Sequence, residues 1–117
     1  MGLKRVWNTV DGVPDELSDV VKFIHPLRQK AVSDAINEAR KNRNVIRLIV
    51  FGSSATGMCT PDSDVDLYVV EDGVRTFVPP TTAIFDVVTP EGLTMDDHLV
   101  KEILRDGIKV YEREDFS

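Results

Sequence analysis

The chain has 117 residues, which is enough for one domain with a single hydrophobic core. Its 42% hydrophobic and 29% charged residues indicate a globular rather than a disordered protein, and no apolar run reaches the about 20 residues that a membrane-spanning helix needs. The net charge of -6 disfavours general binding to a nucleic-acid backbone, because such binding depends on Lys and Arg that neutralise phosphates.

Residues 1–25 form an N-terminal arm in which we predict one short helix. Pro14, followed by Asp15 and Glu16, has the composition of a helix start, because proline suits the first helical position and acids suit the first turn. A longer helix is predicted over residues 26–43, where apolar side chains recur at helical spacing and charged ones fall largely on the opposite side. This helix opens the main domain, which we assign to residues 26–117.

Four short apolar segments predict a sheet. Residues 45–51 indicate a buried strand, and further strands are predicted over residues 65–70, 83–88 and 108–111. Small residues at 52–57 predict a turn after the first strand.

Two further features complete the expected order of elements. Residues 89–92 are predicted to break the chain after the third strand, and Thr94 is placed to cap a helix that ends before Gly107. The order predicts an α/β (α+β) fold with one mixed central sheet and helices packed on it.

Asp64 and Asp66 are the first candidate functional residues. They lie two apart at the start of a predicted strand, so both carboxylates point to the same face of the sheet. Two like charges at this spacing repel each other, and Mg²⁺ is a natural compensating cation because it binds carboxylate oxygens together with substrate phosphates. Taken alone, the pair also fits a solvated turn.

The residues upstream favour a phosphate site. The apolar strand runs into Gly52 and Ser53, where glycine permits close approach of the backbone and serine adds a hydroxyl donor. Downstream, Asp86 is flanked by apolar residues, which is costly for a carboxylate unless it is paired, bound to metal or turned to water at a sheet edge. Three acids on neighbouring strands would suit two metal ions, one holding a triphosphate and one polarising an attacking hydroxyl.

These motifs resemble the polymerase-β-like nucleotidyltransferase superfamily, and within it the minimal nucleotidyltransferase branch known as the antitoxin partner of HEPN-domain toxins. An apolar strand, Gly52-Ser53, a loop over residues 54–63 and then Asp64-Val65-Asp66 match the family signature. The third acid, Asp86, is followed by Thr-Pro-Glu-Gly-Leu, a helix and a last strand ending in Tyr-Glu, as in the family. The resemblance covers residues 27–112.

The resemblance implies roles for the same residues. Asp64 and Asp66 would ligate the metal, Asp86 would ligate it and help to deprotonate the acceptor, and Gly52 and Ser53 would bind the triphosphate. The cofactor would be Mg²⁺, with two ions and Mn²⁺ as an alternative, and the substrate would be ATP. AMP would pass to a tyrosine hydroxyl of a HEPN toxin, which is the partner that the resemblance implies.

The loop departs from the family pattern. Relatives often carry arginines where this chain has Ser54, Thr56 and Thr60, and an arginine would add charge-assisted bonds to phosphates. Lys101 and Arg105 are possible substitutes. Two alternatives therefore stay open: an antitoxin that neutralises its partner by binding alone, and a stand-alone transferase for a small hydroxyl compound such as an aminoglycoside.

The expected setting is the cytoplasm. One cysteine, Cys59, excludes an intramolecular disulfide, and the N-terminus lacks the apolar stretch of a secretory signal. Neither a membrane nor direct nucleic-acid binding is expected.

Overall fold

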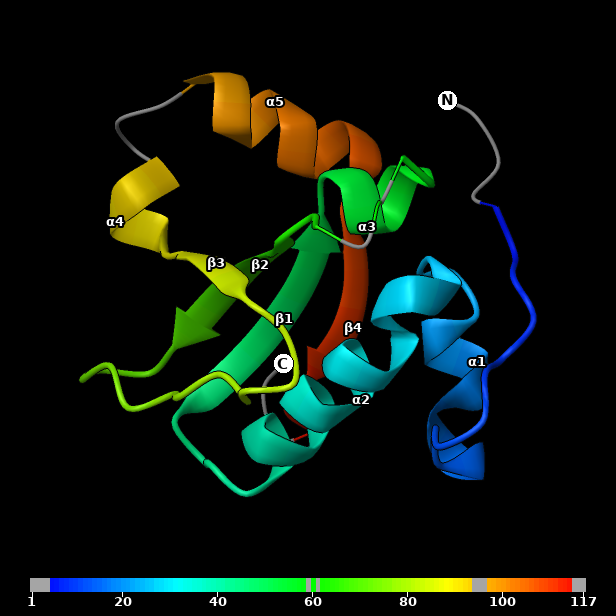
Figure 1. Ribbon diagram of the computed structural model, residues 1–117. Coiled ribbons are helices and arrows are strands. Elements are labelled where there is room, and N and C mark those ends of the chain that lie inside the picture. The colour runs from blue at the N-terminus through cyan, green and yellow to red at the C-terminus, as the bar shows by residue number, and fades with distance from the viewer. Residues whose placement is uncertain (1–4, 59, 61, 94–96, 115–117) are drawn as a thin grey trace.

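The computed structural model describes residues 5–58, 60, 62–93 and 97–114. Helix α2, Pro26–Arg40, lies across one face of a four-stranded sheet. Helix α5, Asp97–Asp106, lies near the place where the first strand ends and the last strand begins (Figure 1). No helix in the described part of the chain is long and apolar enough to cross a membrane. The predicted Thr94 cap, like Cys59, falls outside the described residues.

The sheet is mixed, as the sequence predicts. Its strands are β1 Val45–Phe51, β2 Val65–Glu71, β3 Phe85–Val88 and β4 Ile108–Glu112, in the order β3-β2-β1-β4. β1 pairs antiparallel with β2 and β4, whereas β2 and β3 run parallel.

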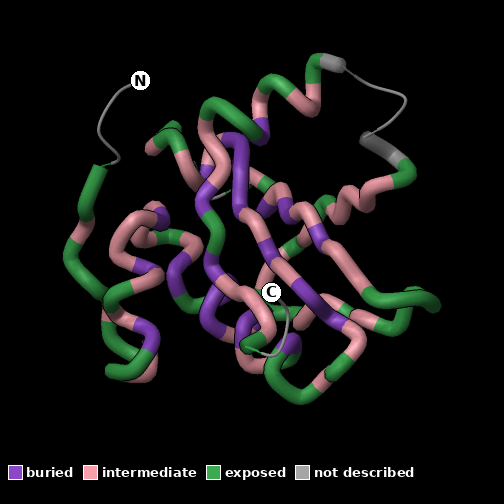
Figure 2. The backbone as a smooth tube through the Cα atoms, turned by 180° about the vertical axis from the view of Figure 1, so that it is seen from behind, coloured by how far each residue is buried: buried purple, intermediate pink, exposed green. Residues whose placement is uncertain are grey.

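Alternation along β1 divides the sheet into two faces. Leu48 and Val50 are fully buried and belong to the same core cluster as the α2 residues Val32 and Ile36. Ile49 points to the other face, where a side chain at Gly107 would meet its Cγ2 atom. Buried residues accordingly follow the central strands and α2, while the loop after β2, residues 72–76, is exposed (Figure 2).

The N-terminal segment packs into this core. After a single 3-10 turn η1, Asp15–Leu17, comes the short helix α1, Ser18–Val21, so the helix expected after Pro14 is present. Leu17, Val21 and Ile24 are buried in the same cluster as the sheet residues. The boundary between residues 25 and 26 stays a prediction.

Several predicted boundaries shift. α2 ends at Arg40 rather than residue 43, because the Asn42 side chain accepts a hydrogen bond from the Asn44 amide at 3.0 Å and turns the chain. The third strand begins at Phe85 rather than residue 83.

Two predicted breaks in the chain are helical turns. The break expected at residues 89–92 is wrong: Pro90–Leu93 form the helical turn α4, since proline is preset for the first helical position. The turn expected at residues 52–57 contains a single helical turn α3, Ser53–Thr56.

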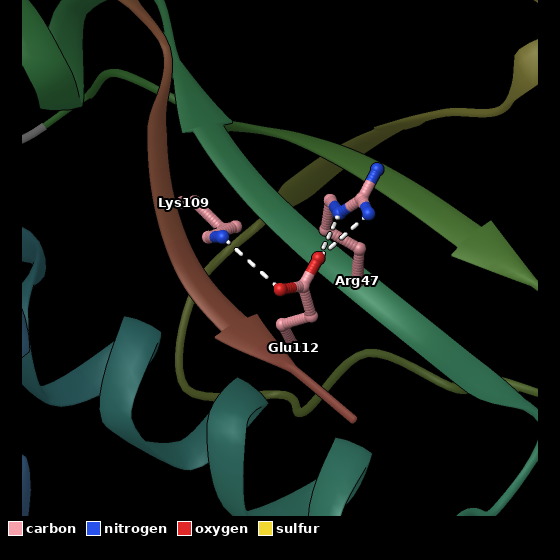
Figure 3. Close-up of polar contacts among 3 residues, drawn as sticks. All are labelled: Arg47, Lys109 and Glu112. Carbon is pink, nitrogen blue, oxygen red and sulfur yellow. Dashed lines mark hydrogen bonds and ion pairs between the residues drawn. The ribbon is translucent and has the colours of Figure 1, made fainter. Parts of the chain in front are cut away.

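An ion-pair cluster joins β4 to β1 at the end of the sheet away from Gly52. The Glu112 carboxylate accepts hydrogen bonds from Arg47 Nε at 2.8 Å and Lys109 Nζ at 3.1 Å (Figure 3). These charges hold the pKa of Glu112 below its usual value.

Candidate active site

Asp66 and Asp86 lie side by side on the sheet. Their Cα atoms are direct partners in the parallel register of β2 and β3, so both side chains extend from the same face. Asp66 is half-buried and Asp86 is exposed. The same register pairs Val65 with Phe85 before the acids and Leu67 with Val87 after them, which fixes the two strands on both sides.

Asp64 completes the predicted trio of acids. It is an exposed residue immediately before β2, and its charge acts on Asp66. Burial, and after it the neighbouring carboxylates of Asp86, Glu102 and Asp64 in that order of size, raise the pKa of Asp66 from 3.8 to about 6. The structure thus brings Asp64, Asp66 and Asp86 together at one edge of the sheet.

Glu102 is an acid that sequence reasoning missed. It lies on α5, is half-buried, and influences the Asp66 carboxylate more strongly than Asp64 does. Glu102 precedes the buried Ile103 on this helix, but periodicity does not show which part of the sheet a helix side will face. Its position depends on how α5 crosses the end of β1.

Gly52 places the backbone against Asp66. Its φ of 72° and ψ of -150° belong to a region that essentially only glycine occupies, and a Cβ atom there would overlap the Asp66 Oδ2 atom. The chain therefore turns directly beside the acid, between β1 and α3.

Ser53 begins α3 next to this turn. The Gly52 carbonyl accepts hydrogen bonds from the amides of Ala55 at 3.0 Å and Thr56 at 3.1 Å. The first N–H groups of a helix have no intrahelical acceptor, so the Ser53 and Ser54 amides have none within this turn. These donors and the Asp66 carboxylate form one polar cradle, which suits a phosphate bound through a metal ion.

The loop positions without arginine differ from one another. Ser54 is buried, and its carbonyl accepts a hydrogen bond from the His25 amide at 3.0 Å, while its Oγ atom has no partner among the described residues. Thr56 and Thr60 are exposed. Arg105, suggested above as a substitute, is engaged with Asp106 at 2.9 Å.

The donor set fits a metal ion that binds together with a nucleotide. Within the described ranges, no three His, Cys, Asp or Glu side chains form a group able to hold an ion as they stand. Mg²⁺ in nucleotide sites takes one or two carboxylates and completes its shell with waters and phosphates. Asp64, Asp66 and Asp86 would hold it, and it would neutralise the mutual repulsion that raises the pKa of Asp66.

Two hollows, of about 570 Å³ and about 550 Å³, lie away from these acids. The first lies between α2 and β4 and is lined by residues such as Arg40 and Tyr111, and the second is lined by residues such as Asn42 and Phe77. None of the three acids lines either of these two hollows.

A family comparison agrees with this geometry. The model of the nucleotidyltransferase domain matches residues 32–115, which include all three acids and the Gly52 turn. The chain belongs to the nucleotidyltransferase domain family. The nucleotidyltransferase resemblance and the α+β fold predicted from the sequence are both confirmed.

Solved structures extend the comparison. A crystal structure described as a toxin-antitoxin with AMP-PNP is 16% identical, with a TM-score of 0.54, over 69% of this chain and 73% of that one. A candidate nucleotidyltransferase from Sulfolobus solfataricus is 17% identical, with a TM-score of 0.41, over 91% of this chain and 96% of that one. No curated protein matches the chain.

Proposed function

We propose that this nucleotidyltransferase transfers AMP from ATP to a hydroxyl group of a partner toxin, a HEPN protein with a tyrosine acceptor, and so acts as a cytoplasmic antitoxin. The observation that carries the proposal is the parallel pairing of Asp66 with Asp86, with Asp64 beside them and the Gly52 turn in contact. The toxin-antitoxin relative crystallised with AMP-PNP supports the choice of nucleotide and partner.

The residues divide the work of the transfer. The Gly52 and Ser53 turn binds the triphosphate, and Asp64 and Asp66 would hold a divalent cation beside it. Asp86, which is exposed, accepts the proton of the acceptor hydroxyl. The acceptor oxygen then bonds to the α-phosphorus as the bond from that phosphorus to the bridging oxygen breaks, and pyrophosphate leaves. Divalent metal ions, when bound, spread the charge that develops on the phosphates.

The test is transfer of label from α-labelled ATP with Mg²⁺ to the copurified partner. We expect label on the partner and a loss of about a thousandfold or more in Asp64→Asn and Asp86→Asn, because each variant removes a carboxylate that would hold the metal ion against the phosphates. Asp19→Asn is the matched control, since Asp19 lies on α1 with an exposed side chain. A partner labelled equally by all variants would contradict the proposed site.

One observation favours a second function: the Ser54 side chain is buried, so it does not reach a phosphate. The arginine that relatives often carry at this position is absent from this chain. A chain with this loop could neutralise its partner by binding alone. The same experiment separates the two functions, because a stable complex with no label on the partner supports binding. Label on an added aminoglycoside instead would identify a small-molecule transferase.

A further inference from the structure

The turn that precedes Asp64 is closed by its own hydrogen bonds. The Ser63 amide donates to the Thr60 carbonyl at 3.0 Å, and the Thr60 amide donates to the Ser63 Oγ atom at 3.0 Å. The two hydroxyl oxygens lie 3.1 Å apart. Thr60 and Ser63 are therefore the two ends of one compact turn, and Asp64 is the next residue.

Arg28, in the first part of α2, forms hydrogen bonds to this turn. Its Nε and Nη2 atoms donate to the Ser63 carbonyl at 3.1 and 2.5 Å, and Nη2 also donates to the Thr60 carbonyl at 3.2 Å. The Nη1 atom donates to the Leu27 carbonyl at 3.2 Å, which ties the guanidinium to its own helix. A planar fork of this kind is particular to arginine, because the lysine ammonium is a single point donor.

Both neighbours of Asp64 in the chain are held by hydrogen bonds. On one side, the Ser63 carbonyl is held by Arg28. On the other side, the Val65 amide donates to the Ile84 carbonyl of the segment entering β3 at 2.8 Å. The backbone of Asp64 thus has little freedom to carry its carboxylate away from Asp66. β2 begins only at Val65, so without Arg28 the sheet would anchor Asp64 from one side alone.

We propose that Arg28 is a positioning residue of the transfer site: by binding the Thr60 and Ser63 carbonyls, it holds Asp64 where it can ligate the metal ion. This inference rests on the proposed function, since it assigns Asp64 as a metal ligand. Arg28 acts on the backbone beside Asp64 through these bonds, because the Ser63 and Thr60 acceptors are carbonyl oxygens. Its role is to fix the backbone conformation next to Asp64.

The first test measures how far Arg28 restrains the backbone on either side of Asp64. Backbone hydrogen exchange at the Ser63 and Val65 amides should become about tenfold faster in Arg28→Ala, as expected when a well-formed hydrogen bond is lost. Arg40→Ala is the matched control, because Arg40 lies on the same helix and pairs with Glu16 on the surface at 3.1 Å. Unchanged exchange at both amides would overturn the inference.

The second test separates positioning from simple stabilisation. Mn²⁺ binding is titrated by electron paramagnetic resonance with a non-hydrolysable ATP analogue present. We expect the half-saturating Mn²⁺ concentration to rise about tenfold or more in Arg28→Ala, less in Arg28→Lys, and not at all in Arg40→Ala. A lower melting temperature with unchanged Mn²⁺ binding would overturn the inference, because it would show a structural role only.

Failure of the inference and failure of the proposed function give different results. If the wild type binds Mn²⁺ with the analogue and labels its partner, and Arg28→Ala does the same equally well, the inference alone fails. If the wild type neither binds Mn²⁺ with the analogue nor labels its partner, the proposed function fails, and the inference fails with it. Should Arg28→Ala not fold, Arg28→Lys, which keeps the stem and the charge, decides between these results.

Discussion

Gly52 lies where the chain leaves β1 and passes Asp66, at a φ and ψ that side chains rarely adopt. We expect Gly52→Ala to lower the free energy of unfolding by about 1–3 kcal/mol from backbone strain, and further because the new methyl group meets the Asp66 carboxylate. Urea unfolding measures the loss. Combining it with Asp66→Ala should recover the part due to the steric overlap.

Gly73 provides the control for this experiment. It also has a positive φ, of 85°, but no atom lies within 4 Å of the place that its Cβ atom would take. Gly73→Ala should therefore cost only the backbone strain of about 1–2 kcal/mol. Equal losses at the two glycines would contradict close contact between Gly52 and Asp66.

The raised pKa of Asp66 makes stability depend on pH. Burial and the neighbouring acids raise this pKa from 3.8 to about 6 in the folded chain, so the folded state holds the proton more tightly than the unfolded state does. The stabilisation is complete below pH 3.8 and is lost as the pH rises through about 6. Without divalent ions, we expect wild type to lose stability relative to Asp66→Asn across this window.

Chemical unfolding at several pH values checks this expectation. Asp66→Asn lacks the titrating group, so the difference between the two proteins reports on Asp66 alone. A difference that stays constant from below pH 3.8 to above about 6 would show that the folded state does not perturb this carboxylate.

The elements differ in how far local sequence predicts them. β1 was placed correctly because a run of β-branched and apolar residues bounded by Asn44 and Gly52 is a strong strand pattern. α4 was missed because proline and glycine both mark turns, and the pattern does not say whether a turn becomes helical. On α5, Leu104 is 81% exposed whereas Ile103 is 8% exposed, so apolar composition alone does not show which side of this helix packs on the sheet.

The N-terminal turns η1 and α1 carry a test of the predicted domain boundary. Leu17 is only 3% exposed and packs in the common core, so Leu17→Ala should cost about 2–5 kcal/mol. Val6→Ala is the control in the same arm, because Val6 is 61% exposed and should change stability by less than about 0.5 kcal/mol. Thermal and urea unfolding measure both; a loss under about 0.5 kcal/mol in Leu17→Ala would favour a main domain complete from residue 26.

At the level of the molecule, the sheet separates stability from chemistry. The core lies between α2 and one face, through residues such as Leu48 and Val50, while Asp66 and Asp86 extend from the positions that alternate with them. Removing an acid therefore leaves the core packing in place, which is why the active-site variants above are expected to fold. The mutual repulsion of the acids lowers stability, but it acts on the face of the sheet opposite this core.

Local chemistry predicted the parts of the site: strand alternation predicts that Asp64 and Asp66 share one face, and a glycine after an apolar strand predicts a tight turn. The resemblance of these motifs to a known family then indicated a nucleotidyltransferase. Packing of the whole chain settled the rest. The β2 and β3 register that sets Asp86 beside Asp66, the approach of Glu102, and the reach of Arg28 to a carbonyl 35 residues away join distant segments. Periodicity describes one element at a time, whereas these contacts depend on how elements pack together.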